Sequence, residues 1–261
     1  MLKKRLIGLI TVRNGWAVQS FGYRRYLPLG RPECLVENLD RWGADEILVQ
    51  SIDRTANGLG PDFALLDRLA RLGSGTPLIY GGGIRNVEDG VQVVQRGADR
   101  VTVDALMQDD PAVVEELSGR LGAQAVIASL PVAADAQGLM LLDYRTRKAG
   151  PLPERLRQAI ERGIVSEVLL TDWRHEGSPA AFDEAVIDAF PCRQAALIAF
   201  GGISNATQVQ SLLARPPVVA VAIGNFLAYK EHAVQQHRNA LASTSLRPAS
   251  YAAEYSLIRD V

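Results

Sequence analysis

Two short stretches of this sequence combine an apolar run, adjacent glycines and an Ile-x-Asn triplet in the same order. They are 78–86 (LIYGGGIRN) and 197–205 (LIAFGGISN), 119 residues apart. Each predicts a strand, a tight turn and a helix start. Glycines at such a turn let backbone N–H groups approach an anion, and the helix N-terminus adds partial positive charge. The predicted phosphate-binding residues in these turns are Gly82, Gly83, Gly201 and Gly202. In the alternative, the glycines only form tight turns.

The elements that must position these turns alternate along the whole chain. We expect strands at 5–12, 46–52, 77–80, 101–103, 125–130, 167–171, 196–200 and 218–223. We expect helices at 32–43, 63–72, 87–97, 110–121, 152–163, 179–190, 206–214 and 226–241. Strands that are apolar on both faces indicate a parallel sheet covered by helices. Eight such units favour an α/β fold of the closed (βα)8 TIM barrel type.

A second pair of similar segments occurs at nearly the same spacing as the two glycine stretches. The segment 46–49 (EILV) returns as 167–170 (EVLL), 121 residues later. Two pairs of similar segments at nearly the same spacing indicate duplication of a half-barrel. We therefore interpret 1–261 as one domain, with half-barrels of about 1–121 and 122–243 and a C-terminal tail of 244–261.

Two segments do not fit the regular alternation. Residues 13–32 predict a long polar loop whose arginines and aromatic residues would close as a lid over an anionic ligand; a solvated surface loop is the alternative. The residues concerned are Trp16, Phe21, Tyr23, Arg24, Arg25 and Tyr26. Residues 131–150 predict a polar excursion that contains a small hairpin around 138–144.

Composition narrows the possible functions. The chain has 261 residues, of which 48% are hydrophobic, and a net charge of −1, so neither nucleic acid nor an anionic membrane is an expected partner. No apolar stretch approaches the length of a membrane helix. Cys34 and Cys192 predict free thiols in a reducing cytoplasm. No cluster predicts a metal site, and no dinucleotide or ATP motif predicts a cofactor.

With these features in place, the sequence resembles the HisF family, the cyclase subunit of imidazole glycerol phosphate synthase, over almost its whole length. The matching segments are 5–7 (RLI), 12–15 (VRNG), 43–46 (GADE), 81–84 (GGGI), 96–101 (RGADRV), 124–126 (QAV), 167–171 (EVLLT) and 201–202 (GG). The resemblance implies phosphate sites at the C-terminal ends of the strands and a phosphorylated small-molecule ligand. It also implies a HisH-like glutaminase partner at the opposite, N-terminal face, with ammonia passing through the barrel.

The chain departs from the resemblance where the family places its acid and base. The family has aspartates at the ends of the first and fifth strands; Thr11 and Pro131 occupy those positions here. Neither side chain can exchange a proton near neutral pH. Ser51 stands where a third family aspartate is expected. The possible substitutes in this sequence are Asp53, Asp104, which replaces a family asparagine, Asp135 and His175.

The resemblance also implies a ring of alternating charges at the bottom of the barrel. Arg5, Glu46, Arg100 and Glu167 fall on those four positions, with Arg100 in place of a lysine. Such a ring would gate a small neutral molecule. A structural ring of salt bridges that plugs the barrel end is the alternative.

Further phosphate contacts are expected after the later strands. The candidates are Thr171, Gly177, Gly224 and Asn225. Gly224 and Asn225 follow the eighth strand, where barrels commonly bind phosphate. Ordinary helix capping by the asparagine is the alternative.

Three functions follow from this reading. The first is a diverged synthase subunit that takes ammonia from a glutaminase to a phosphorylated or sugar-type acceptor; relatives without the cyclase aspartates imply amidino-sugar synthesis for surface polysaccharide. The second is an ordinary cyclase subunit of histidine biosynthesis with a relocated acid and base. The third is a non-catalytic activator of a glutaminase. Neighbouring genes and complementation of a histidine auxotroph distinguish them.

Overall fold

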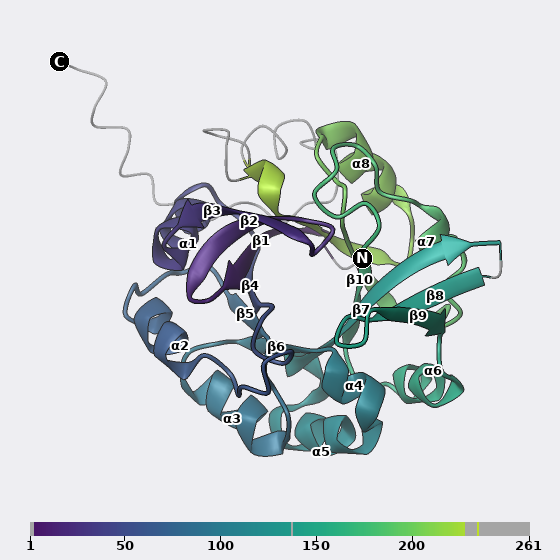
Figure 1. The fold of residues 1–261 in the computed structure, drawn as a ribbon, viewed down its shortest axis with the longest axis horizontal. Coiled ribbons are helices and arrows are strands. Elements are labelled where there is room, and N and C mark those ends of the chain that lie inside the picture. Colours follow the sequence, from purple (N-terminus) through teal and green to yellow (C-terminus); the bar gives the residue numbers. More distant parts are fainter. Residues whose placement is uncertain (1–2, 137, 228–233, 235–261) are drawn as a thin grey trace.

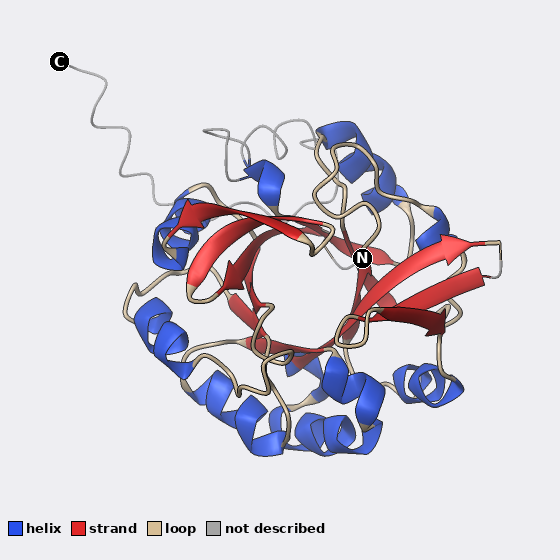
Figure 2. Cartoon of the chain, viewed as in Figure 1, coloured by secondary structure: helices blue, strands red, loops and turns tan. Residues whose placement is uncertain are grey.

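The computed structural model describes residues 3–136, 138–227 and 234. Eight parallel strands form a closed barrel, and its helices lie outside the ring (Figures 1 and 2). β10 pairs with both β7 and β11, and β12 pairs with β1, so the ring closes. The strands are β1 (Arg5–Arg13), β4 (Glu46–Ser51), β5 (Leu78–Gly81), β6 (Arg100–Val103), β7 (Val126–Asp135), β10 (Glu167–Asp172), β11 (Ala196–Phe200) and β12 (Val218–Ile223). The predicted (βα)8 barrel is confirmed.

The helices bury one apolar stripe each against the strands. They are α1 (Pro32–Arg41), α2 (Phe63–Ala70), α3 (Val87–Gln95), α5 (Pro111–Leu121), α6 (Glu154–Glu161), α7 (Ala185–Asp188) and α8 (Ala206–Ala214). Leu65, Leu66 and Leu69 of α2 illustrate the stripe, because all three are buried. A short α4 (Ala105–Asp109) and a 3₁₀ turn, η1 (Ala123–Ala125), flank α5 and were not predicted.

One predicted helix differs from the structure, and another lies almost wholly outside the described residues. The helix expected at 179–190 is wrong except for α7, because the N–H groups of Ala181 and Phe182 donate to the carbonyl of Gly202 and hold that segment across the second glycine turn. The helix expected at 226–241 and the tail lie almost wholly outside the described residues. At its start the chain forms the 3₁₀ turn η2 (Asn225–Leu227).

The loop expected at 13–32 is instead a β-hairpin. β2 (Trp16–Phe21) pairs antiparallel with both β1 and β3 (Arg25–Gly30). Asn14 and Gly15 join β1 to β2, and both have the positive φ that a two-residue hairpin turn requires. The Asn-Gly pair was therefore a signal for the antiparallel pairing of β2 with β1.

The segment after the fifth barrel strand also forms a sheet extension. β7 continues to Asp135 and pairs with β8 (Gly138–Asp143), which pairs in turn with β9 (Lys148–Pro151). The predicted hairpin thus becomes part of a three-stranded antiparallel extension. In Figure 1, β2–β3 and β8–β9 stand at different sides of the barrel opening.

Candidate functional site

A cavity of about 380 Å³ opens at the C-terminal ends of the barrel strands. Three parts of the chain line it: the strand ends, the hairpin β2–β3 and the extension β8–β9. Barrel enzymes place their active sites at this face, because the loops after the strands converge there. The lining residues used below are Arg13, Asn14, Tyr23, Arg24, Tyr26, Gln50, Asp53, Thr55, Gly82, Gly83, Asp104, Pro131, Tyr144, Arg147, Thr171 and Trp173.

The first glycine turn lies on this cavity, at the end of β5. Gly82 and Gly83 both have positive φ. A Cβ on Gly82 would lie 2.1 Å from the carbonyl oxygen of Ser51, so the close approach here is to the chain itself. The Gly83 N–H donates to Thr55 Oγ1 at 3.1 Å. The α3 N-terminus is capped by Asn86, whose Oδ1 accepts from the Asp89 N–H at 2.8 Å.

The second glycine turn does not line the cavity. Other backbone segments cover both glycines. A Cβ on Gly201 would lie 2.5 Å from the Asp172 carbonyl oxygen, and a Cβ on Gly202 would lie 2.8 Å from the Phe182 nitrogen. The Asn205 side chain caps α8, as Asn86 caps α3. Both turns therefore lie at the C-terminal face, but only the first opens on the cavity.

The hairpin β2–β3 covers two further residues of the second predicted phosphate site, Gly177 and Asn225. Asn225 exchanges two hydrogen bonds with the main chain of Ser20. A Cβ on Gly177 would lie 2.3 Å from the Ser20 carbonyl oxygen. The buried Glu176 carboxylate accepts from Ser20 Oγ at 3.0 Å and from the Tyr23 N–H at 3.2 Å. Of that predicted set, Gly177, Gly201, Gly202, Gly224 and Asn225 lie apart from the cavity, whereas Thr171 lines it.

The positions of the missing aspartates carry no acid or base. Thr11 is buried in β1 and does not line the cavity. Pro131 lines it and pairs in register with Thr171 across β7 and β10. Proton transfer from either position is therefore excluded by the side chains present.

Two of the four predicted substitutes reach the cavity. Asp53 lines it, and its Oδ2 accepts from the Asn14 N–H at 3.0 Å. Asp104 follows β6 and accepts from Gln108 Nε2 at 2.9 Å. Burial raises the pKa of Asp104 to about 7, since desolvation outweighs the hydrogen bond from Gln108 and the nearby charge of Arg145. The carboxyl therefore exchanges a proton near neutral pH.

The other two substitutes do not line the cavity. Asp135 ends β7 and lies 3.6 Å from the guanidinium of Arg174. His175 is part-exposed, and its Nδ1 lies 2.6 Å from the Asp172 carboxylate, which is buried. That carboxylate orients the imidazole, but the pair lies beside the second glycine turn.

The floor of the cavity carries polar atoms without partners. Thr171 Oγ1, Gln50 Oε1 and Trp173 Nε1 are buried and make no hydrogen bond within the described chain. The Thr171 side chain is 2% exposed. Buried polar groups normally pair with protein or ordered water, so these three atoms are free to bond to a molecule in the cavity.

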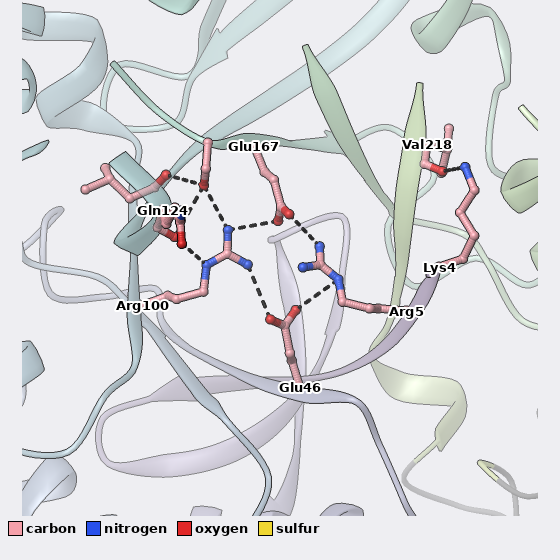
Figure 3. Close-up of polar contacts among 9 residues, drawn as sticks. Lys4, Arg5, Glu46, Arg100, Gln124, Glu167 and Val218 are labelled. Carbon is pink, nitrogen blue, oxygen red and sulfur yellow. Dashed lines mark hydrogen bonds and ion pairs between the residues drawn. The ribbon is translucent and has the colours of Figure 1, made fainter. Parts of the chain in front are cut away.

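At the opposite end of the barrel, four charged residues form a closed ring (Figure 3). Arg5, Glu46, Arg100 and Glu167 are each the first residue of their strand. Arg5 lies 3.5 Å from Glu46 and 2.7 Å from Glu167; Arg100 lies 3.3 Å from Glu46 and 2.9 Å from Glu167. Arg100 Nε also donates to the Gln124 carbonyl at 2.9 Å. Each guanidinium thus bridges both carboxylates, and the ring is neutral overall.

The ring is shielded from solvent. Side-chain exposure ranges from 8% for Glu46 to 19% for Arg5. Burial raises the pKa of Glu46, with Glu167 adding to the shift and both arginines opposing it. Removing one member of such a buried ring would leave a charge without its counter-charge, which is strongly destabilising.

An apolar layer lies inside the barrel above the ring. Its residues are Ile7, Leu9, Leu48, Ile79, Ile127, Leu169, Ile198, Phe200, Ala220 and Ala222. Tyr23, at the turn of β2–β3, packs on this layer and also lines the cavity. The barrel axis therefore runs from a charged ring, through apolar side chains, to a polar cavity.

Sequence reasoning missed several residues of the cavity. Tyr144 and Arg147 come from β8–β9, and Gln50 from β4. Both Tyr144 and Arg147 fall within the predicted excursion of residues 131–150, and Tyr144 ends its predicted hairpin, which was the available signal for the first two. Gln50 breaks an otherwise apolar strand near its C-terminal end, which was a signal for the third.

Within the described part of the chain, no group of three or more His, Cys, Asp and Glu side chains is arranged to hold a metal ion. No helix among the described residues is both long enough and apolar enough to cross a membrane. Cys34 and Cys192 are both unpaired, as predicted.

Comparison with known proteins agrees with this architecture. A family model described as "Histidine biosynthesis protein" matches residues 5–233. A protein of Leptospira interrogans, provisionally named as imidazole glycerol phosphate synthase subunit HisF, is 29% identical over 88% of this chain and 92% of its own length. The imidazole glycerol phosphate synthase subunit HisF of Hyphomonas neptunium is 28% identical over 93% of this chain and 96% of its own. The chain therefore belongs to the histidine biosynthesis protein family, with HisF-named proteins among its relatives.

Proposed function

We propose that this chain is a HisF-like synthase subunit that receives ammonia from a glutaminase and delivers it to an acceptor in the cavity. The acceptor is a phosphorylated or sugar-type molecule, and amidino-sugar synthesis is the proposed use. The observation that carries the proposal is the combination of an intact charged ring with Thr11 and Pro131 at the aspartate positions. The chain keeps the parts that transfer of ammonia would use and lacks those of the family's cyclisation.

The ring supports the proposal through its position and neutrality. A glutaminase docked at the N-terminal face would release ammonia next to Arg5, Glu46, Arg100 and Glu167. The apolar layer above them favours neutral ammonia over ammonium, because desolvating an unpaired charge costs far more than desolvating a neutral molecule. Ammonia that crosses the layer reaches the cavity next to Tyr23.

Only the first of the two glycine turns is proposed to contact the acceptor directly. Gly82 and Gly83 are proposed to contact a phosphate of the acceptor, since they line the cavity. Phosphate binding at Gly177, Gly201, Gly202, Gly224 and Asn225 stays a prediction. At Gly177 and Asn225 it requires the hairpin β2–β3 to move away, because Ser20 of this hairpin contacts both residues.

The test substitutes Glu167→Gln in the complex with its glutaminase. The change leaves two guanidinium groups with one carboxylate between them, so the ring opens and ammonia leaks to solvent. We expect glutamine hydrolysis to continue while product per glutamate falls, and free ammonia to restore product formation. Glu161→Gln, on the exposed face of α6, is the matched control. An unchanged ratio in a folded Glu167→Gln variant would favour a purely structural plug.

Asp104 supports a second candidate, a cyclase subunit of histidine biosynthesis with a relocated proton-exchanging group. Its carboxyl lines the cavity and titrates near neutral pH. Complementation of a cyclase-deficient histidine auxotroph separates the two candidates. Growth that is lost in Asp104→Asn would favour the cyclase, whereas no growth with the unmodified chain would favour the first proposal.

A further inference from the structure

We infer that Tyr23 is a steric barrier between the apolar layer of the barrel and the cavity, and that the buried carboxylate of Glu176 holds it there. The charged ring closes one end of the apolar layer, and Tyr23 closes the other end, so solvent in the cavity is kept out of the barrel interior. The inference rests on the proposed function only in naming ammonia as the molecule that passes this barrier.

The apolar layer and the cavity meet at one residue. Ten buried side chains form the layer, and none of them lines the cavity. Tyr23 packs against the layer and also lines the cavity, which no other residue of the described chain does. The Tyr23 side chain therefore lies between the apolar interior and the polar cavity.

The Tyr23 hydroxyl lies in a desolvated place although the residue as a whole is part-exposed. Burial raises the pKa of this hydroxyl well above its ordinary value, and the charges of Glu176 and Asp104 add to the shift. The phenol thus stays neutral, and a neutral group costs far less to hold against an apolar layer than a charged one does. The ring is directed inward, while the backbone of the turn accounts for the exposed part.

The turn that carries Tyr23 has a strained backbone. The Arg24 N–H donates to the Phe21 carbonyl at 3.2 Å, and the two residues between them, Gly22 and Tyr23, have φ of +60° and +52°. Glycine and asparagine adopt this conformation readily, whereas a bulky residue is strained by it. Such strain collects at functional sites. At Tyr23 it accompanies an aromatic ring that is placed on the barrel interior.

Glu176, in the loop after β10, holds this turn. Its carboxylate accepts from Ser20 Oγ at 3.0 Å and from the Tyr23 N–H at 3.2 Å, and its backbone carbonyl accepts from the Gly22 N–H at 2.9 Å. Glu176 is only 4% exposed, and burial raises the pKa of its carboxyl while these bonds oppose the shift. One buried residue thus fixes both the strand end and the turn, and with them the Tyr23 ring.

A barrier at this place makes the barrel interior a compartment that is closed at both ends. Ammonia inside it stays neutral as long as water is excluded, because an unpaired charge is costly in an apolar layer. Movement of the turn away from Glu176 would lift Tyr23 and open the layer to the cavity. An acceptor in the cavity contacts Tyr23 directly, so its binding favours one position of the turn over the other.

Thiol labelling of the purified chain with methyl methanethiosulfonate tests the barrier. Ala222→Cys places a thiol in the apolar layer, and Cys34→Ser removes the exposed native thiol. We expect Tyr23→Ala and Glu176→Ala each to speed labelling at position 222 by at least ~10-fold, because each removes contacts that close the layer. Mass spectrometry locates the label. Cys192 is buried outside the barrel interior and reports general unfolding, so its labelling should not change.

Tyr26→Ala is the matched control. Tyr26 lies on the same hairpin and lines the cavity, but it stacks with the Arg13 guanidinium at 4.5 Å and does not pack on the apolar layer. Labelling at position 222 should stay within about twofold of the parent in this variant. Tyr23→Phe keeps the ring and should also label slowly.

Three results would overturn the inference. They are slow labelling at position 222 in Tyr23→Ala, equally fast labelling in Tyr26→Ala, and an equal rise at Cys192 in Tyr23→Ala. In the complex with its glutaminase, Tyr23→Ala should also lower product per glutamate, whereas Tyr23→Phe should keep it. The labelling needs neither glutaminase nor ammonia, so failure of the barrier is distinguishable from failure of ammonia coupling.

Discussion

Asn225 ties the end of the barrel to the hairpin β2–β3 by two hydrogen bonds with Ser20, which lies 205 positions earlier. The Ser20 N–H donates to Asn225 Oδ1 at 3.2 Å, and Asn225 Nδ2 donates to the Ser20 carbonyl at 2.6 Å. Ser20 is fully buried. The side chain expected to bind phosphate or cap a helix thus satisfies the backbone of a strand.

Asn225→Ala should release this hairpin. Two buried backbone groups of Ser20 would lose their partners, which costs about 1–3 kcal/mol of unfolding free energy. Hydrogen exchange should become faster across residues 16–30 and stay unchanged in the barrel strands. Asn38→Ala, which removes only an exposed bond to Arg41, is the control. Unchanged exchange in the hairpin would show that Asn225 does not hold it.

The stability of the protein should fall as pH rises through the titration of Asp104. Its pKa is about 7 in the folded chain against an ordinary value of 3.8. Below pH 3.8 both states are protonated and the group has no effect. Between these values the folded state keeps a proton that the unfolded state loses, so stability declines, and above about pH 7 the full cost is present.

Asp104→Asn should remove this pH dependence. The variant should be more stable than the unmodified chain at pH 8 by about 1–3 kcal/mol, and the difference should vanish toward pH 4. Chemical denaturation at several pH values measures it. Glu37→Gln, an exposed carboxylate of α1, should leave the profile unchanged. A constant difference between pH 4 and 8 would contradict the assignment to Asp104.

Substitution of glycine by alanine should have opposite effects on stability at two positions of this chain. Gly82→Ala places a Cβ 2.1 Å from the Ser51 carbonyl oxygen at a φ of +116°, so a loss of at least ~2 kcal/mol is expected. Gly119→Ala adds a methyl group within α5 with nothing inside 4 Å, so a gain of about 0.5–1 kcal/mol is expected. Thermal unfolding of both variants tests the pair, and similar melting temperatures would refute it.

The family's cyclase reaction should be absent or very weak in this chain. A positioned acid and a positioned base are each worth about 10²–10⁴-fold, and Thr11 and Pro131 supply neither. Thr11→Asp alone should help little, because paired catalytic groups act as a unit. Turnover with saturating ammonia measures the reaction without a partner. A rate within about tenfold of a HisF protein with both aspartates would refute the expectation.

The sequence by itself determined the barrel, because its signals are local. Apolar runs of strand length alternate with helical spacing, and each glycine turn carries its own capping asparagine, Asn86 or Asn205. The charged ring was expected from the family resemblance, and barrel closure brings Arg5, Glu46, Arg100 and Glu167 together because each begins its strand.

Only the tertiary structure decided which predicted residues share one site. Asn225 and Glu176 hold the hairpin β2–β3 through contacts with Ser20 that span 205 and 156 positions, and this placement covers Gly177 and Asn225. The pKa of Asp104 likewise depends on desolvation by the surrounding chain and on the charges of Arg145 and Asp143, which are remote in sequence. Local patterns cannot specify such contacts, because their energy depends on where distant segments pack once the barrel has closed.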